Sequence, residues 1–154
     1  MKAQIKQEKE TRTEALLREA ASALEAAGVK RTPQREILLA LLLQKDFHPS
    51  AEELEREANK HLPVSTTTVY ISLRTLTEAG LIHAVLDKSG RIRYGGWPKP
   101  HIHYLCEICQ DIADAEATDF PTFFPAAPEN WERKEEAPLV VARGYCPRCK
   151  NIRG

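Results

Sequence analysis

Four cysteines carry the strongest chemical signal in this sequence, because they fall into two pairs with C-x-x-C spacing. Cys106 and Cys109 lie in the stretch HIHYLCEIC, and Cys146 and Cys149 lie in YCPRC near the end of the chain. Each C-x-x-C turn directs two thiolates at one ion, and Zn²⁺ takes four thiolates in a tetrahedron with no open position. The sequence therefore predicts a structural Zn²⁺ site that joins two segments far apart in the chain.

Other chemistries for the cysteines fit the pattern less well. The alternatives are a thioredoxin-like redox pair and incidental buried thiols. A redox pair is expected once, at a turn from a strand into a helix, whereas this chain has two pairs and neither opens a clear helix. A zinc deaminase would need a His-x-Glu motif and a Pro before the first Cys, and both are absent.

Two histidines in the same stretch indicate a second, different metal site. His101 and His103 are two residues apart on an expected strand, so their side chains leave the same face. Imidazole pairs bind transition metals such as Zn, Fe, Ni or Mn, and Asp114 on the next expected strand would complete the set. Cys106 lies at odd separation from His103, which places the sulfurs on the opposite face. The alternative is a pair of exposed polar strand residues.

The remaining histidines are ambiguous when each is taken alone. His48 follows an expected helix in Phe47-His-Pro, His83 lies in an expected strand, and His61 lies in a turn. Each of these patterns is typical of an ordinary solvated histidine.

Composition bounds the fold and says little about partners. The chain has 154 residues, a formal net charge of +0, and no apolar run near the ~18 residues of a membrane helix. Residues 1–94 carry 15 Lys+Arg against 13 Asp+Glu, so bulk charge does not argue for nucleic acid. The polar N-terminus does not match a secretory signal. We therefore expect a cytoplasmic protein without membrane contact, in which C-x-x-C pairs bind metal rather than form disulfides.

The first half of the chain predicts a winged helix-turn-helix domain. Helical spacing of apolar residues, Thr32-Pro33, a Ser50–Glu53 capping box and Gly80 predict four helices followed by a β-hairpin with an Asp-Lys-Ser-Gly turn. The expected elements are helices at 13–27, 33–44, 51–60 and 66–80, and strands at 81–86 and 91–94. A charged helical extension is expected before Thr13. The residues expected in the core are Ile37, Leu38, Leu41 and Leu42 of the second helix and Val69, Leu73 and Leu76 of the fourth. The third and fourth helices would form the helix-turn-helix pair.

The second half predicts a smaller domain after a hinge. Strand-like runs occur at 101–105, 112–117 and 139–143, and a proline-rich stretch at 119–138 leaves room for one short helix near 128–135. We expect an α+β protein: a winged-helix domain at 1–94, a hinge at 95–100, and a zinc-stabilised α/β domain at 101–154.

Many collinear residues resemble the ferric uptake regulator (Fur) family of bacterial metal-dependent repressors, over roughly residues 15–150. They are Gly28-Val-Lys-Arg-Thr-Pro-Gln-Arg35, His48-Pro, Ala51-Glu-Glu-Leu54, Thr68-Val-Tyr70, Leu73, Leu76, Ala79-Gly-Leu81, Arg93-Tyr94, the His101–Cys109 motif, Asp114 and Gly144-Tyr-Cys146-x-x-Cys149. The resemblance implies a homodimer that binds palindromic, A/T-rich double-stranded DNA operators. It also implies a structural Zn²⁺ and a second divalent metal, Fe²⁺/Mn²⁺ or Zn²⁺, which bridges the domains.

The resemblance assigns the regulatory ligands to His48, His101, His103 and Asp114. An aspartate at this last position resembles the peroxide-sensing branch of the family. A further ligand, a carboxylate just before the hinge, has no counterpart, because this chain offers Tyr94 or Gly95 there. His83 is the expected substitute, since the zinc-uptake branch places a ligand in the matching strand. Pro100 and Ile102 exclude a third metal site, and the proline-rich stretch replaces the long helix that relatives use at the dimer interface.

The fourth helix is expected to read the major groove with the residues near its N-terminus. The candidates are Thr66, Thr67, Thr68, Tyr70 for thymine methyls, and Arg74 for phosphate or guanine. Lys30 matches a family position that reaches the minor groove. Ile71 stands where the family often has an arginine, so one DNA contact is expected to be missing.

We predict a metal-dependent transcriptional repressor rather than an enzyme. It would sense peroxide, iron or manganese, with a zinc-uptake-type regulator as the next alternative. A zinc-dependent hydrolytic enzyme at His101 and His103 is less well supported, because no further ligand with a general base lies near them. A DNA-binding protein that holds only structural zinc also fits the missing carboxylate.

Overall fold

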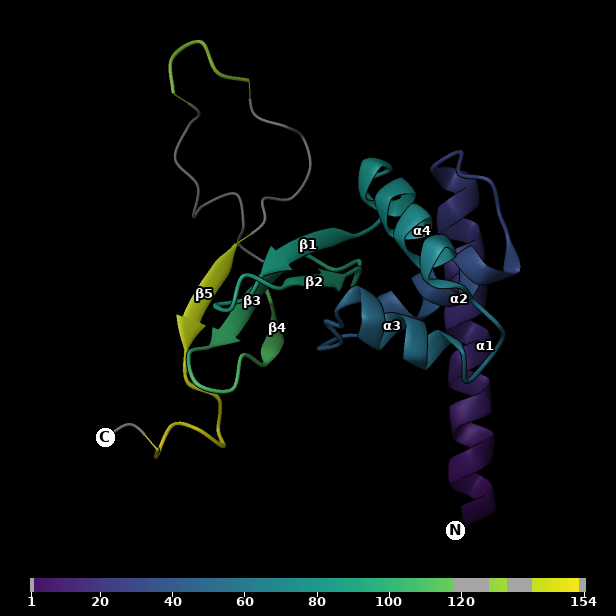
Figure 1. Cartoon of the computed structure of the whole chain (residues 1–154), viewed down its shortest axis with the longest axis horizontal. Helices are drawn as coiled ribbons and strands as arrows, with labels where there is room; N and C mark the ends of the chain where they lie inside the picture. The colour runs from purple at the N-terminus through teal and green to yellow at the C-terminus, as the bar shows by residue number, and fades with distance from the viewer. Residues whose placement is uncertain (1, 118–127, 133–139, 153–154) are drawn as a thin grey trace. The chain divides into compact units, whose positions relative to one another are not determined.

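The computed structural model describes residues 2–117, 128–132 and 140–152, and it divides into two compact units, Met1–Pro98 and Lys99–Gly154. The first contains four helices and a hairpin, and the second contains a three-stranded sheet (Figure 1). The predicted α+β class is confirmed. None of the helices in the described part of the chain is long and apolar enough to cross a membrane.

The first unit has four helices, and the last three begin where a side chain caps them. They are α1 (Lys2–Ala26), α2 (Pro33–Leu42), α3 (Ala51–Ala58) and α4 (Thr66–Glu78). Thr32 Oγ1 accepts the backbone N–H of Arg35 at 3.1 Å, and Ser50 closes the predicted capping box with Glu53. Ser65 caps α4 by accepting the N–H of Thr68 at 3.2 Å. The helix expected at 13–27 extends back to Lys2, so the charged extension expected before it is also helical.

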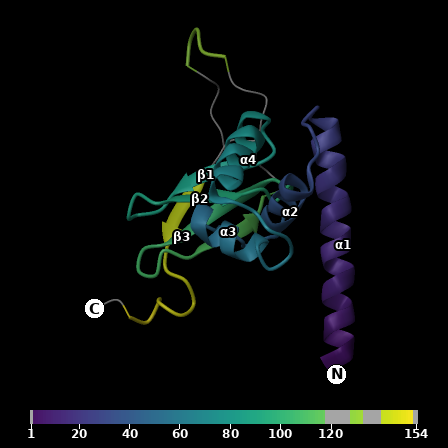
Figure 2. The same cartoon turned by 45° about the vertical axis from the view of Figure 1, so that its right-hand side comes forward.

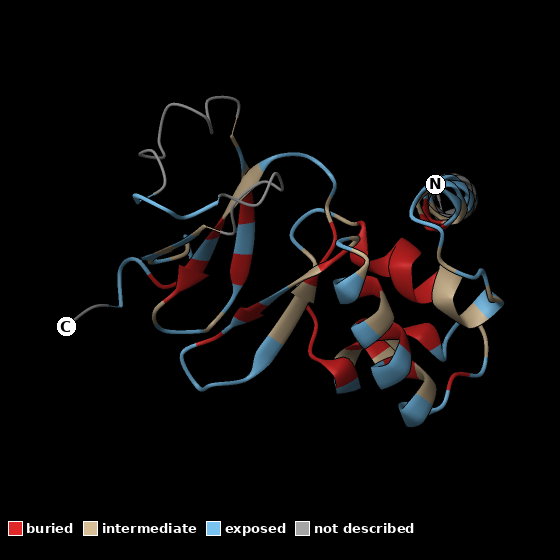
Figure 3. Ribbon diagram, turned by 90° about the horizontal axis from the view of Figure 1, so that it is seen from above, coloured by how far each residue is buried: buried red, intermediate tan, exposed pale blue. Residues whose placement is uncertain are grey.

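The core of this unit is centred on α2, which contacts α1, α3 and α4 (Figures 2 and 3). We expected four of its residues to face the core, but all seven residues from Ile37 to Leu43 are buried. A helix with neighbours on several sides is buried around most of its circumference, which explains the difference. From α4, Val69, Leu73 and Leu76 pack into the same core, as predicted.

The hairpin consists of β1 (His83–Leu86) and β2 (Ile92–Gly95), joined by a turn that Asp87 organises. The buried Asp87 accepts the backbone N–H groups of Ser89 and Arg91, each at 2.9 Å, and the Nε–H of Arg93 at 3.2 Å. Burial by itself would raise the pKa of Asp87, but the hydrogen bonds outweigh it and lower that pKa. The register pairs His83 with Gly95.

The second unit is built on β3 (His101–Cys106), which lies between antiparallel β4 (Ile112–Glu116) and parallel β5 (Val141–Gly144). These strands match the three predicted runs to within a few residues. The short helix expected near 128–135 and the proline-rich dimerisation segment lie largely outside the described residues. Within them, residues 128–132 contain a turn closed by the N–H of Trp131 and the carbonyl of Pro128.

Candidate metal centres

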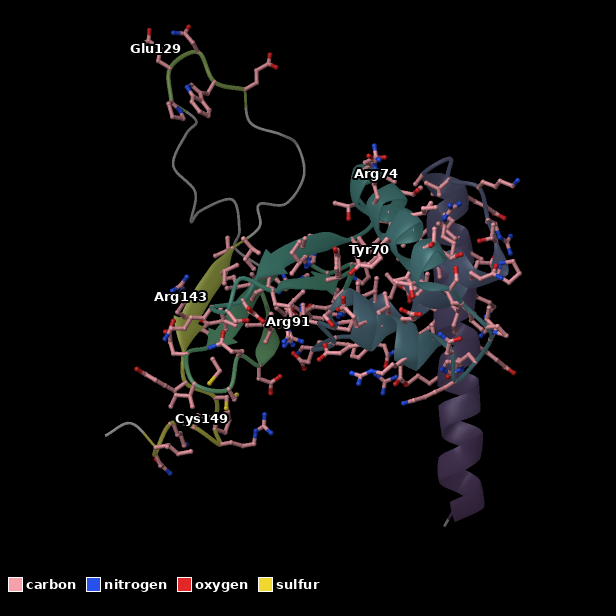
Figure 4. The ribbon with its side chains drawn as sticks, in the orientation of Figure 1. Tyr70, Arg74, Arg91, Glu129, Arg143 and Cys149 are labelled. Carbon is pink, nitrogen blue, oxygen red and sulfur yellow. The ribbon has the colours of Figure 1, made fainter. Side chains whose placement is uncertain are left out.

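The four cysteines meet at the ends of β3 and β5. Their Sγ atoms all lie within 4.8 Å of one another, and no disulfide joins them. A tetrahedron of sulfurs ~2.3 Å from Zn²⁺ has edges of about 3.8 Å, and the Sγ atoms of Cys109 and Cys146 are 3.7 Å apart. The residues present therefore fit a closed tetrathiolate zinc site. Figure 4 labels Cys149, the last of the four, on the turn after β5.

Backbone geometry prepares the thiols to bind a cation. The backbone N–H of Cys146 donates to the Sγ of Cys106 at 3.4 Å. This hydrogen bond, together with one from the backbone N–H of Cys109, lowers the pKa of Cys106 to about 6. Burial raises the pKa of Cys149 to about 12, so the pKa values of these two thiols are shifted in opposite directions. Arg148 pairs with Asp111 at 2.8 Å and ties the two cysteine turns together.

His101, His103 and Asp114 form a second cluster within the same sheet. His103 and Asp114 are direct cross-strand neighbours, with Nδ1 of the imidazole 3.0 Å from Oδ1 of the carboxylate. His101 Nε2 lies 3.6 Å from the same oxygen, and its Nδ1 contacts the carbonyl oxygen of Lys99. All three side chains are buried. Two imidazoles and one carboxylate are suitable donors for a divalent transition metal, and three protein ligands leave positions open.

His48 and His83 converge in the first unit, at the position of Gly95. A Cβ atom added to Gly95 would lie 2.8 Å from Nε2 of His48 and 3.1 Å from Nε2 of His83. Both imidazole edges therefore occupy the space that any larger residue would need. His83 reaches this point because it lies opposite Gly95 in the hairpin register.

Backbone hydrogen bonds hold the loop that carries His48 against β2. The N–H of Tyr94 donates to the carbonyl of Pro49, and the N–H of Gly96 donates to the carbonyl of Leu42, both at 2.9 Å. Arg93 adds a side-chain contact to the carbonyl of His48 at 3.4 Å and an ion pair with Glu53. The sequence marks Gly95 as a position where the carboxylate ligand is missing, but it gives no indication of the approach of two imidazoles to this residue. Its signal would have been a glycine directly across a hairpin from a histidine.

The predicted DNA-reading residues lie on α4 or before α2. Thr66, Thr67, Tyr70 and Arg74 are exposed, and Figure 4 shows Tyr70 and Arg74 on α4, whereas Thr68 is half-buried and bonded to Ser65. Lys30 is exposed in the loop between α1 and α2. The hydroxyl of Tyr70 donates to Glu52 at 2.9 Å, and the hydroxyl of Thr66 donates to Glu55 at 2.8 Å.

Known proteins are similar to this chain in sequence and in fold. Residues 26–131 match the model of the ferric uptake regulator family. The peroxide-responsive repressor PerR of Staphylococcus aureus is 31% identical over 99 residues, which cover 64% of this chain and 67% of that protein. The match to the family model spans α2, α3, α4, the hairpin and the strands β3 and β4 that carry the histidine cluster.

Solved structures agree with the fold. A zinc uptake regulator in complex with zinc and DNA has a TM-score of 0.61 at 25% identity, over 91% of this chain and 96% of that one. The ferric uptake regulator Fur of Helicobacter pylori has a TM-score of 0.62 at 21% identity, over 90% and 93% of the two chains, and it has three functional metal-binding sites. Proteins of this family are DNA-binding transcription regulators and not enzymes. The chain belongs to the ferric uptake regulator family.

Proposed function

We propose that this protein is a homodimeric repressor whose binding to palindromic, A/T-rich operators depends on a second metal ion. The four cysteines hold Zn²⁺ as a structural ion. The regulatory ion takes its ligands from His48, His83, His101, His103 and Asp114. That one ion joins the ligands of both units stays a prediction based on the family resemblance. Binding of the ion to one arrangement of the units would shift the population toward the DNA-competent state.

The geometry around Gly95 favours zinc as the regulatory metal. At this position the family resemblance implies a carboxylate, whereas here two imidazole edges occupy the space and the ligand is supplied from the opposite strand by His83. Imidazole suits Zn²⁺, while carboxylates suit Mn²⁺. Exchange of a carboxylate for an imidazole therefore moves the donor set toward zinc. The zinc-bound regulator among the structural neighbours at 25% identity supports this proposal.

Metal-dependent selection of DNA tests the function itself. Chains carrying only the cysteine-bound metal would be loaded separately with Zn²⁺, Mn²⁺ and Fe²⁺ and used to select sites from a random DNA pool. We expect selection with Zn²⁺ and loss of binding when the second ion is removed by a mild chelator. Equal DNA affinity with and without the second ion would leave only a constitutive DNA-binding protein.

A ligand exchange across the hairpin tests the choice of metal. The double variant His83→Ala, Gly95→Asp moves the ligand back to β2 as a carboxylate and removes one of the two imidazoles that its Cβ would meet. The ring of His48 would still have to shift, which affects the affinity for both metals, so the ratio of the two affinities is compared. We expect the ratio of Zn²⁺ to Mn²⁺ affinity to fall by about tenfold or more. The single variant Gly95→Asp is the matched control, because its side chain meets His48 and His83. An unchanged affinity ratio in the double variant would argue against zinc selectivity at this position.

Peroxide sensing is the second candidate, and Asp114 is the observation that favours it. The resemblance places an aspartate at this position in the peroxide-sensing branch, and PerR of S. aureus is a relative at 31% identity. On this alternative, the ligand histidines would hold Fe²⁺, and the ion would supply the chemistry by which hydrogen peroxide transfers one oxygen atom to a histidine ring. The test is mass spectrometry of the Fe²⁺ form after peroxide treatment, with addition of one oxygen atom to His48 or His103 as the expected result. Unmodified histidines after loss of DNA binding would exclude it.

A further inference from the structure

Two carboxylates on α3 accept hydrogen bonds from two exposed hydroxyl groups on the neighbouring helix α4. Glu52 and Glu55 are one helical turn apart on α3, and Thr66 and Tyr70 are one turn apart on α4. The hydroxyl of Tyr70 donates to Glu52 at 2.9 Å, and that of Thr66 donates to Glu55 at 2.8 Å. The two helices pack over an apolar core that includes Leu54, and these two hydrogen bonds lie at the surface of that core.

The direction of both bonds is fixed by chemistry. An ionised carboxylate can only accept, so each hydroxyl must use its single proton toward α3. The pKa of Glu52 is lowered, first by a backbone N–H at the start of α3 and then by Tyr70, which keeps this carboxylate ionised. The same contact raises the pKa of Tyr70, which keeps its proton in place. The oxygen atoms of Tyr70 and Thr66 therefore face outward with lone pairs only.

The other acidic and hydroxyl groups nearby differ from this pair. Glu53 forms an ion pair with Arg93 at 2.7 Å, and Glu57 pairs with Lys60. Arg56 and Arg91 line the same surface groove as Glu52 and Glu55, but within the described residues no ion pair joins either of these two carboxylates to a cation. Thr68 shares a contact with Ser65 in which either hydroxyl can donate. Thr75 and Thr77, further along α4, donate to backbone carbonyls of the same helix. Among the predicted reading residues that the structure describes, Thr66 and Tyr70 are the hydroxyls whose hydrogen bonds have an assigned direction.

We propose that Glu52 and Glu55 determine which bases α4 reads, by making Tyr70 and Thr66 hydrogen-bond acceptors only. This inference rests on the proposed reading of the major groove by α4, and it replaces the thymine-methyl contact expected for Tyr70 from the sequence with a hydrogen bond to a base donor. An acceptor requires a donor on the base edge, and in the major groove the donors are N6 of adenine and N4 of cytosine. Guanine and thymine present only acceptors at the corresponding atoms, so they leave the oxygen facing a like lone pair. Tyr70 is 48% exposed, so its oxygen is accessible to such a partner.

Operator selection with matched variants tests this assignment. Wild type, Tyr70→Phe, Glu52→Gln and the control Glu57→Gln would be compared in the same metal-loaded state. We expect wild type to prefer adenine or cytosine at one position per half-site and Tyr70→Phe to lose that preference by about tenfold. Glu52→Gln should relax it as well, because a glutamine amide can donate to the tyrosine oxygen and free its proton. Glu57→Gln should leave it unchanged.

A base analogue separates acceptor chemistry from a general loss of affinity. Replacement of the selected adenine by purine, which lacks the 6-amino group, should lower the DNA affinity of wild type by about tenfold and that of Tyr70→Phe by much less. Two results would overturn the proposal while leaving the repressor function intact. One is a wild-type preference for guanine or thymine at the position where Tyr70→Phe loses base preference. The other is an unchanged base preference in Glu52→Gln. If wild type selects no DNA with any metal, the proposed function fails, and this inference fails with it.

Discussion

Two clusters on the same strand illustrate different uses of metal ligands. The cysteine cluster joins the ends of β3 and β5 with four like donors from two turns, so an ion there closes the fold. The cluster of His101, His103 and Asp114 lies across the paired strands β3 and β4, whose register already fixes its geometry. The sheet can therefore form without an ion at the second cluster. A site whose occupancy is not required for folding is free to respond to metal concentration.

The largest effect should come from breaking the cysteine cluster. Cys106→Ser removes a zinc ligand whose Sγ also accepts the backbone N–H of Cys146. The linked loss of folding free energy is on the order of 10 kcal/mol for a structural zinc. We expect the second unit to lose both its zinc and its cooperative unfolding transition, measured by elemental analysis and thermal denaturation. Ile108→Ser, at an exposed position in the same turn, is the control. A folded, metal-free protein would contradict the structural role of the zinc.

Removal of the carboxylate from the histidine cluster should affect binding and spare folding. We expect Asp114→Ala to lower the affinity for the second ion by about 100-fold or more. Mutation of residues that only hydrogen-bond to metal ligands already lowers metal affinity by about 10- to 100-fold. The zinc content at the cysteines should remain unchanged. The control is Glu116→Ala, two residues further along β4, where the side chain is about half exposed and pairs with Lys99. Titration calorimetry gives the affinity, and equal losses in both variants would remove the distinction.

Gly95→Ala tests whether His48 and His83 need the space that the missing side chain of Gly95 leaves to them. Its Cβ would lie 2.8 Å from His48, a distance that requires the ring to move. We expect the second ion to bind about tenfold more weakly, by analogy with other changes that misplace a ligand. Gly144→Ala, whose Cβ would meet nothing within 4 Å, should have no effect on that affinity. Wild-type affinity in Gly95→Ala would show that the position is not restrictive.

The smallest effect concerns acid stability of the hairpin that carries His83. The folded pKa of Asp87 is lowered, so its contribution is fully present above its unfolded pKa of about 4 and is lost as pH falls through the lower, folded value. Asp87→Asn should reduce stability by about 1 kcal/mol at neutral pH. The difference from wild type should shrink as the pH falls below about 4, measured by urea denaturation. A constant difference across this range would assign the loss to packing instead.

Much of the fold follows from local signals in the sequence. Ser50 with Glu53, Thr32 before Pro33, and Ser65 each begin a helix where their side chains can cap it, and these rules depend only on neighbours in the chain. The burial of all of Ile37–Leu43 was underestimated, because the number of helices that surround α2 is a tertiary property. The proline-rich stretch gives no such local signal and lies largely outside the described residues.

The hairpin register shows why part of the site could not be read from the sequence. A four-residue turn would place His83 opposite Tyr94, whereas the observed turn extends to Arg91 and places it opposite Gly95. A shift of one residue exchanges the faces of a strand, so it decides which side chain approaches His48. Asp87 sets this turn through bonds to Ser89, Arg91 and Arg93.

The sequence by itself determined the ligand types, the paired cysteine spacing, the alternation of His101 and His103, and the family. These features depend on residue identity and on the fixed periods of strands and helices. Only the tertiary structure decided that Asp114 faces His103, that His48 and His83 meet at Gly95, and that α3 carboxylates hold Thr66 and Tyr70. Each of these contacts joins residues brought together by register or helix packing, which no local pattern encodes.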